Sequence, residues 1–127
     1  MNPFEQGEVF TLAVEGTIVG KHMTDFQIVL STCADHEQAE RIAHRLVEQQ
    51  VAACVNILPG VQSIYRWQGK VDSTGEVLML IKTRADLVPD VETTIASLHS
   101  YQVPEVLVLP VFGGSHAYLA WLTDSLR

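Results

Sequence analysis

The chain has 127 residues, 47% of them hydrophobic, which is enough for one buried core and too few for two ordinary domains. Its 15 acidic residues outnumber the 8 basic ones and give a net charge of −7 at pH 7. A negative surface repels phosphate backbones and anionic lipid head groups, which argues against nucleic acid and membranes as partners.

The first 23 residues carry no signal for secretion or membrane insertion. Glu5, Glu8 and Glu15 lie there without a basic segment, and the longest apolar run is confined to residues 10–14. The pattern does not continue into the strong strand that follows Met23. We therefore interpret residues 1–23 as an N-terminal extension or an artificial leader, and residues 24–127 as the domain.

A strand followed by a helix is predicted at the start of this domain. The segment Phe26–Thr32 is apolar and rich in β-forming residues, and Asp35 with Gln38 three residues later indicates a capped helix start. Apolar residues then recur at helical spacing, so we expect an amphipathic helix that packs on one side. Its apolar stripe comprises Ala39, Ile42, Ala43, Leu46 and Val47.

The next segment predicts one long strand. Val51–Leu58 is a short apolar run, and residues 61–67 continue it with β-branched and aromatic side chains. Pro59-Gly60 separates the two runs, and we interpret it as a bulge or bend within the strand.

A tight turn and a returning strand complete a hairpin with long arms. Trp67-Gln68-Gly69-Lys70 has the composition of a turn, and the returning strand reaches Lys82. We expect a break or twist near Asp72–Gly75. The unbroken apolar run Val77–Ile81 is typical of a strand at the centre of a sheet or covered on both faces.

A second helix is predicted after Arg84. Asp86 is a candidate N-cap, and Pro89 is tolerated in the first turn. The helix ends near His99. Its apolar stripe comprises Val88, Val91, Ile95 and Leu98.

The chain ends with a strand and a short helix. Pro104 precedes a predicted strand over Glu105–Phe112, and Gly113-Gly114 leads into a helix from about Ser115. One face of this helix would carry Tyr118, Leu119, Leu122 and Leu126.

The predicted order is strand, helix, strand, strand, helix, strand and a terminal helix, which is an α+β, ferredoxin-like βαββαβ arrangement. Both main helices should then cover one face of an antiparallel sheet. The sheet is apolar on both faces, and two helices with a short tail cannot cover it all. We therefore expect burial against other copies of the chain.

Three sequence blocks together closely resemble the CutA divalent-cation tolerance family, and the resemblance covers residues 25–127. The blocks are Ala53–Gly60 with Ser63–Lys70, Tyr101–Leu107 with Leu109-Pro110-Val111, and Tyr118–Leu122. The resemblance implies a ferredoxin-like subunit in a tight homotrimer, with the hairpin strands pairing across subunit boundaries. It also implies a role in tolerance to copper and other divalent cations.

The residues that could bind copper or another divalent cation are few. His99 matches the histidine that precedes the family's Tyr-x-x-Pro-Glu block and is the first candidate ligand, the alternative being a polar interface or helix-terminal histidine. Cys33 and His36 are three residues apart and could approach one ion, although two ligands make a weak site. Cys33 and Cys54 are too few for a disulfide framework, which favours a reducing compartment, the cytoplasm.

A second candidate is a pocket between subunits that binds a small polar ligand. Rings would stack on the ligand and charges would orient it. Its predicted residues are Tyr65, Trp67, Lys70, Lys82, Tyr101 and Glu105. The simpler interpretation of the aromatic residues is that they anchor a subunit interface.

Motifs of common enzyme classes are missing from the sequence: it has no Gly-x-Ser-x-Gly elbow, P-loop or dinucleotide fingerprint. The leading hypothesis is thus a cytoplasmic trimeric binding or signalling protein of divalent-metal tolerance rather than an enzyme. The alternatives are a small-ligand sensor similar in architecture to the PII signalling proteins, and an uncharacterised enzyme in the same cleft.

Overall fold

The structure is a computed structural model that describes residues 9–11, 18–20 and 24–127. Strands β1 (Val9–Thr11) and β2 (Ile18–Gly20) pair antiparallel in a two-stranded sheet of their own. Both belong to the predicted extension, and the rest of that segment lies outside the described residues.

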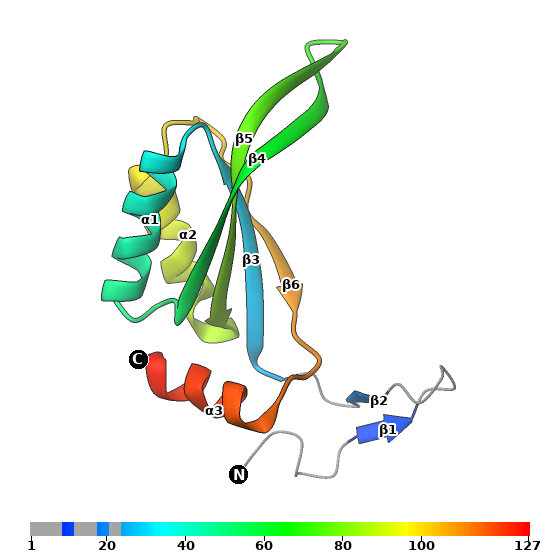
Figure 1. Cartoon of the computed structure of the whole chain (residues 1–127), viewed down its shortest axis with the longest axis vertical. Helices are drawn as coiled ribbons and strands as arrows, with labels where there is room; N and C mark the ends of the chain where they lie inside the picture. The colour runs from blue at the N-terminus through cyan, green and yellow to red at the C-terminus, as the bar shows by residue number, and fades with distance from the viewer. Residues whose placement is uncertain (1–8, 12–17, 21–23) are drawn as a thin grey trace.

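The main sheet has four antiparallel strands in the order β4-β5-β3-β6, and α1 and α2 lie on one of its faces (Figure 1). This order confirms the predicted ferredoxin-like arrangement. The elements are β3 (Phe26–Cys33), α1 (His36–Glu48), β4 (Cys54–Trp67), β5 (Lys70–Arg84), the 3₁₀ turn η1 (Ala85–Leu87), α2 (Val88–Leu98), β6 (Leu107–Pro110) and α3 (His116–Ser125).

Side-chain caps begin two of the three α-helices found among the described residues. Asp35 Oδ1 accepts a hydrogen bond of 2.8 Å from the Gln38 amide at the start of α1, as predicted. Ser115 Oγ accepts from the Tyr118 amide at the start of α3. The predicted Asp86 cap of α2 is wrong. The Asp86 carboxylate pairs instead with the Arg84 guanidinium, with 2.6 Å between Oδ1 and Nε. A 3₁₀ turn and a proline in the first turn begin α2 instead.

The hairpin of β4 and β5 contains the predicted bulge and turn. Pairing shifts from Leu58 with Leu78 to Val61 with Glu76, so two residues of β4 face one residue of β5. Gly60 adopts φ +75° there. The predicted break near residues 72–75 is wrong, because β5 runs unbroken and the irregularity lies wholly in β4.

The core lies between the sheet and the two helices. Val77, Met79 and Ile81 alternate along β5 toward the helices and are at most 7% exposed. They pack in one cluster with Val29 and Cys33 of β3 and with the apolar faces of α1 and α2. The opposite face, with Leu30, Leu78 and Leu80 on it, carries neither α1 nor α2, and we call it the helix-free face.

Two predictions, the burial of Val47 and the length of the last strand, are wrong. Val47, predicted in the apolar stripe of α1, is 41% exposed. The last strand is only Leu107–Pro110, shorter than predicted, because it pairs with β3 alone, over Gln27–Leu30, and lies at the sheet edge.

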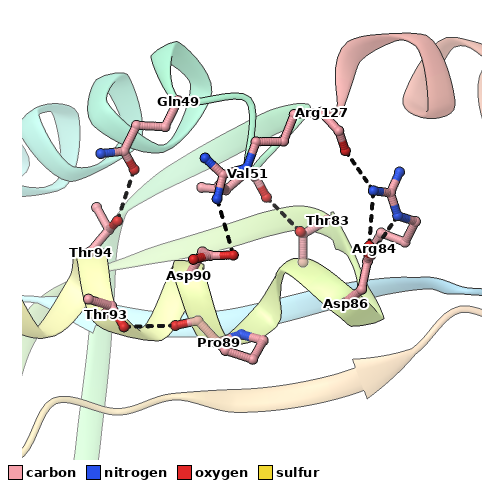
Figure 2. A network of polar contacts seen from close by, with 10 residues as sticks. All are labelled: Gln49, Val51, Thr83, Arg84, Asp86, Pro89, Asp90, Thr93, Thr94 and Arg127. Carbon is pink, nitrogen blue, oxygen red and sulfur yellow. Dashed lines mark hydrogen bonds and ion pairs between the residues drawn. The ribbon is translucent and has the colours of Figure 1, made fainter.

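The end of the chain is tied to the opposite end of the sheet from the hairpin turn. The Arg84 Nη2 group donates to the Arg127 carbonyl at 2.6 Å, and the Arg127 guanidinium pairs with Asp90 at 3.2 Å (Figure 2). Leu119 and Leu122 of α3 are buried as predicted, whereas Tyr118 is 40% exposed. In the described part of the chain, every helix is too short or too polar to cross a membrane.

Candidate functional site

A groove of about 910 Å³ lies beside the hairpin. One wall comes from β4 and β5, the other from the segment 101–105 between α2 and β6, and Thr32 at the end of β3 lies between them. The groove therefore forms where three segments that are distant in sequence meet.

Strand pairing puts the hairpin residues of the groove, apart from Ile64, on the helix-free face. Tyr65 pairs with Asp72 and Ser63 pairs with Thr74. Glu76 alternates with Val77, which points toward the helices, so its carboxylate points the other way. Trp67 shares the face of Tyr65 and is 62% exposed.

Tyr101 joins the second wall to the first. Its hydroxyl donates to Glu76 Oε2 at 2.9 Å, and burial, reinforced by this hydrogen bond, raises the pKa of Tyr101 to about 12. The phenol therefore stays protonated and keeps donating across the physiological pH range.

His99 fixes the segment that carries Tyr101. Its Nε2 lies 2.6 Å from the Thr32 carbonyl oxygen, and its Nδ1 accepts from the Tyr101 amide at 3.0 Å. A carbonyl can only accept and an amide can only donate, so the ring is neutral with its proton on Nε2. The imidazole also packs against the Tyr101 ring, with centroids 4.7 Å apart.

The charged residues that line the groove are all acidic: Asp72, Glu76 and Glu105. The rings of Tyr65, Trp67 and Tyr101 lie among them. Carboxylates and aromatic faces both attract cations, and the same carboxylates repel phosphates. The groove is therefore suited to a positively charged ligand.

The comparisons with known proteins now identify the family. The profile described as "CutA1 divalent ion tolerance protein" matches residues 27–125. The chain belongs to the CutA1 family.

Relatives in this family come from bacteria, plants and vertebrates. The divalent-cation tolerance protein CutA of Thermus thermophilus is 46% identical over 99 residues, which cover 78% of this chain and 96% of that protein. The chloroplastic CutA of Arabidopsis thaliana is 44% identical over 100 residues, which cover 79% of this chain and 55% of that protein.

Solved CutA structures share the fold. CutA from Xylella fastidiosa superposes with a TM-score of 0.79 at 41% identity, covering 82% of this chain and all of that one. An Archaeoglobus fulgidus CutA, described as periplasmic, gives a TM-score of 0.77 at 34% identity, covering 80% of this chain and 99% of that one.

The other two predicted metal ligands lie apart from the groove. The Cys33 side chain is fully buried in the core, and burial, with smaller contributions from Asp35 and Glu76, raises the pKa of its thiol to about 11. The thiolate that binds metals is thus disfavoured. His36 lies at the surface, with Nε2 2.8 Å from Glu40 Oε1.

A metal site built by one CutA1 subunit alone is missing from the described residues. Within residues 9–11, 18–20 and 24–127, no three His, Cys, Asp or Glu side chains gather closely enough to hold an ion. His99 uses both ring nitrogens for backbone groups, so a metal there would have to displace one of these hydrogen bonds.

Four of the six predicted pocket residues line the groove: Tyr65, Trp67, Tyr101 and Glu105. The two lysines do not. Lys82 donates instead to the Tyr118 hydroxyl at 3.0 Å, a bond that raises the pKa of Lys82. Sequence reasoning missed Asp72 and Glu76, because it expected a break or twist near Asp72–Gly75. In the continuous strand β5 their spacing of four residues places them on one face.

Proposed function

We propose that this chain is a homotrimeric binding and signalling protein of divalent-cation tolerance, copper included, that works in the cytoplasm and is not an enzyme. The observation that carries the proposal is exposed apolar surface on the hairpin and on β6. Ile64 and Val71 are each 69% exposed, Trp67 is 62% exposed and Leu107 is 56% exposed.

Assembly would remove this surface from water. The hairpin extends beyond the two helices (Figure 1), and β4 forms one edge of the sheet while β6 forms the other. Open strand edges with apolar side chains favour pairing with another chain, and two different edges that meet head to tail form a ring when the rotation between subunits closes. The number three rests on the resemblance to the CutA family.

The role in metal tolerance is supported by the family description and by relatives named divalent-cation tolerance proteins. Since no described set of three ligands exists within one subunit, we expect the metal to take ligands from more than one subunit. The free thiols of Cys33 and Cys54 support the cytoplasm as the compartment.

Two separate measurements test the proposal. Light scattering on the purified chain should give the mass of a trimer, and a stable monomer would contradict it. Copper titration under reducing conditions should show weaker binding by His99→Ala than by the wild type. His44→Ala, which changes an exposed histidine of α1, is the matched control and should bind as the wild type does.

A small-ligand sensor similar in architecture to the PII proteins is the second candidate. The groove favours it, because its volume and aromatic lining are those of a ligand site. Glu105→Gln, at the groove wall, should then weaken ligand binding while the mass by light scattering remains that of a trimer.

A further inference from the structure

The connector between α2 and β6, residues 100–105, has one main-chain hydrogen bond within the part of the chain that the structure describes. The Tyr101 amide donates to His99 Nδ1 at 3.0 Å, and the other backbone groups of the connector pair with no described residue. A side-chain hydrogen bond of 2.9 Å, from the Tyr101 hydroxyl to Glu76, ties the connector to β5. Val103, in its middle, is 85% exposed. The connector is therefore sensitive to the loss of its single main-chain bond.

His99 has no spare lone pair for a metal ion. Copper binds imidazole through the lone pair of a ring nitrogen, and the ring of this half-buried residue has two nitrogens. The Nδ1 lone pair accepts from the Tyr101 amide, and Nε2 carries the proton that is donated to the Thr32 carbonyl at 2.6 Å. A metal ion can therefore bind this ring only in place of one of the two hydrogen bonds.

Both ways of binding a metal remove the same hydrogen bond. Binding at Nδ1 uses the lone pair that accepts from the Tyr101 amide. Binding at Nε2 moves the proton of the neutral ring to Nδ1, which leaves the charge of the ring unchanged. Nδ1 is then a donor that faces the amide donor of Tyr101. In either case the Tyr101 amide loses its acceptor.

Tyr101 links this hydrogen bond to the hairpin. Its ring packs against the imidazole of His99, with centroids 4.7 Å apart, and its hydroxyl is bonded to Glu76 of β5. One residue thus contacts both His99 and the hairpin. A change at His99 is therefore passed to β5, whose exposed Val71 belongs to the surface that we propose for assembly.

We infer that His99 is a metal-sensitive latch: a metal ion bound by its ring frees the Tyr101 amide and loosens residues 100–105 from the hairpin. The inference rests on the proposed binding of metal at His99 and adds the conformational consequence of that binding. It gives a signalling protein a structural change through which a bound metal acts on the hairpin.

Amide hydrogen exchange, followed by NMR under reducing conditions, tests the latch. Copper is then Cu(I), which has no unpaired electron, so the amide resonances remain observable. Saturating copper should speed exchange of the Tyr101 amide about fivefold, because the amide loses its acceptor. The Leu119 amide of α3, which donates to the Ser115 carbonyl at 3.0 Å, is the internal control and should exchange at an unchanged rate.

Two variants of His99 separate the metal ligand from the hydrogen-bond acceptor. His99→Asn removes the imidazole but places its side-chain oxygen close to the position of Nδ1, so the Tyr101 amide should still exchange slowly. His99→Ala removes the acceptor as well, so this amide should exchange fast without copper. Copper should change the exchange rate in neither variant.

The coupling should also act in the opposite direction, from the connector to the metal. Tyr101→Phe removes the hydrogen bond to Glu76, so the connector opens more easily and copper should bind about fivefold more tightly. The matched control is Tyr118→Phe, which removes the hydroxyl that accepts from Lys82 and should leave the copper affinity unchanged. In a His99→Asn background, Tyr101→Phe should give no gain.

The outcomes distinguish the latch from the proposed function. Copper binding that is weakened by His99→Ala but leaves the Tyr101 amide slow would overturn the latch alone. Faster exchange at both the Tyr101 and Leu119 amides would overturn it too, since copper would then destabilise the whole fold. Equal copper affinity of wild type and His99→Ala would overturn the latch together with the proposed ligand. A monomer by light scattering would contradict only the proposed assembly.

Discussion

Ser31 is a buried polar residue with an unfavourable environment. Its Oγ is the one buried side-chain polar atom in the described part of the chain that has no hydrogen-bond partner. Thr83, on the neighbouring strand β5, is buried as well, but its hydroxyl donates to the Val51 carbonyl at 2.6 Å (Figure 2). Two buried hydroxyl groups in one sheet thus have opposite energetic roles.

Replacing these two hydroxyls should change stability in opposite directions. Ser31→Ala removes an unsatisfied group and should raise the free energy of unfolding by about 1 kcal/mol, whereas Thr83→Val leaves the Val51 carbonyl unpaired and should lower it by about 1–2 kcal/mol. Urea unfolding of both variants measures the difference. A loss of stability in Ser31→Ala comparable to that in Thr83→Val would contradict the assignment.

Cys33 should make stability depend on alkaline pH. Its folded pKa of about 11 exceeds the ordinary value of 9.0 because burial opposes the thiolate. The folded state therefore gains stability from the protonated thiol below pH 9, and this contribution is lost as the pH rises through 11. A rise of this size corresponds to about 2–3 kcal/mol.

The Cys33→Ala variant isolates this effect. Unfolding free energies of wild type and variant, measured from pH 8 to 11.5, should converge or cross as the pH rises, because only the wild type loses the thiol contribution. Tyr101 titrates in both proteins, and its contribution cancels in the difference apart from the small electrostatic effect of Cys33 on the pKa of Tyr101. A difference in unfolding free energy that stays constant over this pH range would show that the pKa of the Cys33 thiol is not raised.

In the hairpin, one glycine is required by backbone conformation and another is not. Gly60, in the bulge of β4, has φ +75°, whereas Gly75, in β5, has no positive φ, and an added Cβ would meet no atom within 4 Å at either position. Gly60→Ala should lower the free energy of unfolding by about 1 kcal/mol, because L-residues avoid this region. Gly75→Ala is the matched control and should be neutral or slightly stabilising. Equal melting temperatures of the two variants would contradict the argument.

Sequence patterns predicted the elements where the determinants are local. The Asp35 cap, the Pro59-Gly60 bulge and the two-residue turn each depend on neighbouring residues, and all three are present. The prediction of an Asp86 cap was wrong because the Arg84 guanidinium binds the same carboxylate. This competition depends on where the side chains lie in the folded chain. The predicted length of β6 was wrong because this length depends on how much of β3 is available for pairing.

The groove could be predicted only in part for a similar reason. Its aromatic residues stand out in composition, and Tyr101 with Glu105 lies in a recognisable block. Lys82 shares the helix-free face with Glu76, but six residues of strand separate the two by about 20 Å. Strand alternation fixes the face of a residue, whereas the position along the strand that a distant segment reaches depends on the folded chain.

The whole molecule has apolar surface that its own helices do not cover. We expect folding to be coupled to assembly, so that the melting temperature rises with protein concentration. For a reversible transition from folded trimer to unfolded monomers, a tenfold increase in concentration stabilises each trimer by about 2–3 kcal/mol. The net charge of −7 per chain opposes close association, so added salt should favour the assembled state.

A pair of variants tests which surface mediates this coupling. Ile64→Asp places a charge on the hairpin, where the side chain is 69% exposed, and Val47→Asp places one on α1, where it is 41% exposed. Only Ile64→Asp should lower the mass by light scattering and remove the concentration dependence of melting, because a buried unpaired charge destabilises an interface by several kcal/mol. A wild-type melting temperature that is independent of concentration, or equal effects of the two variants, would show that the exposed hairpin does not mediate assembly.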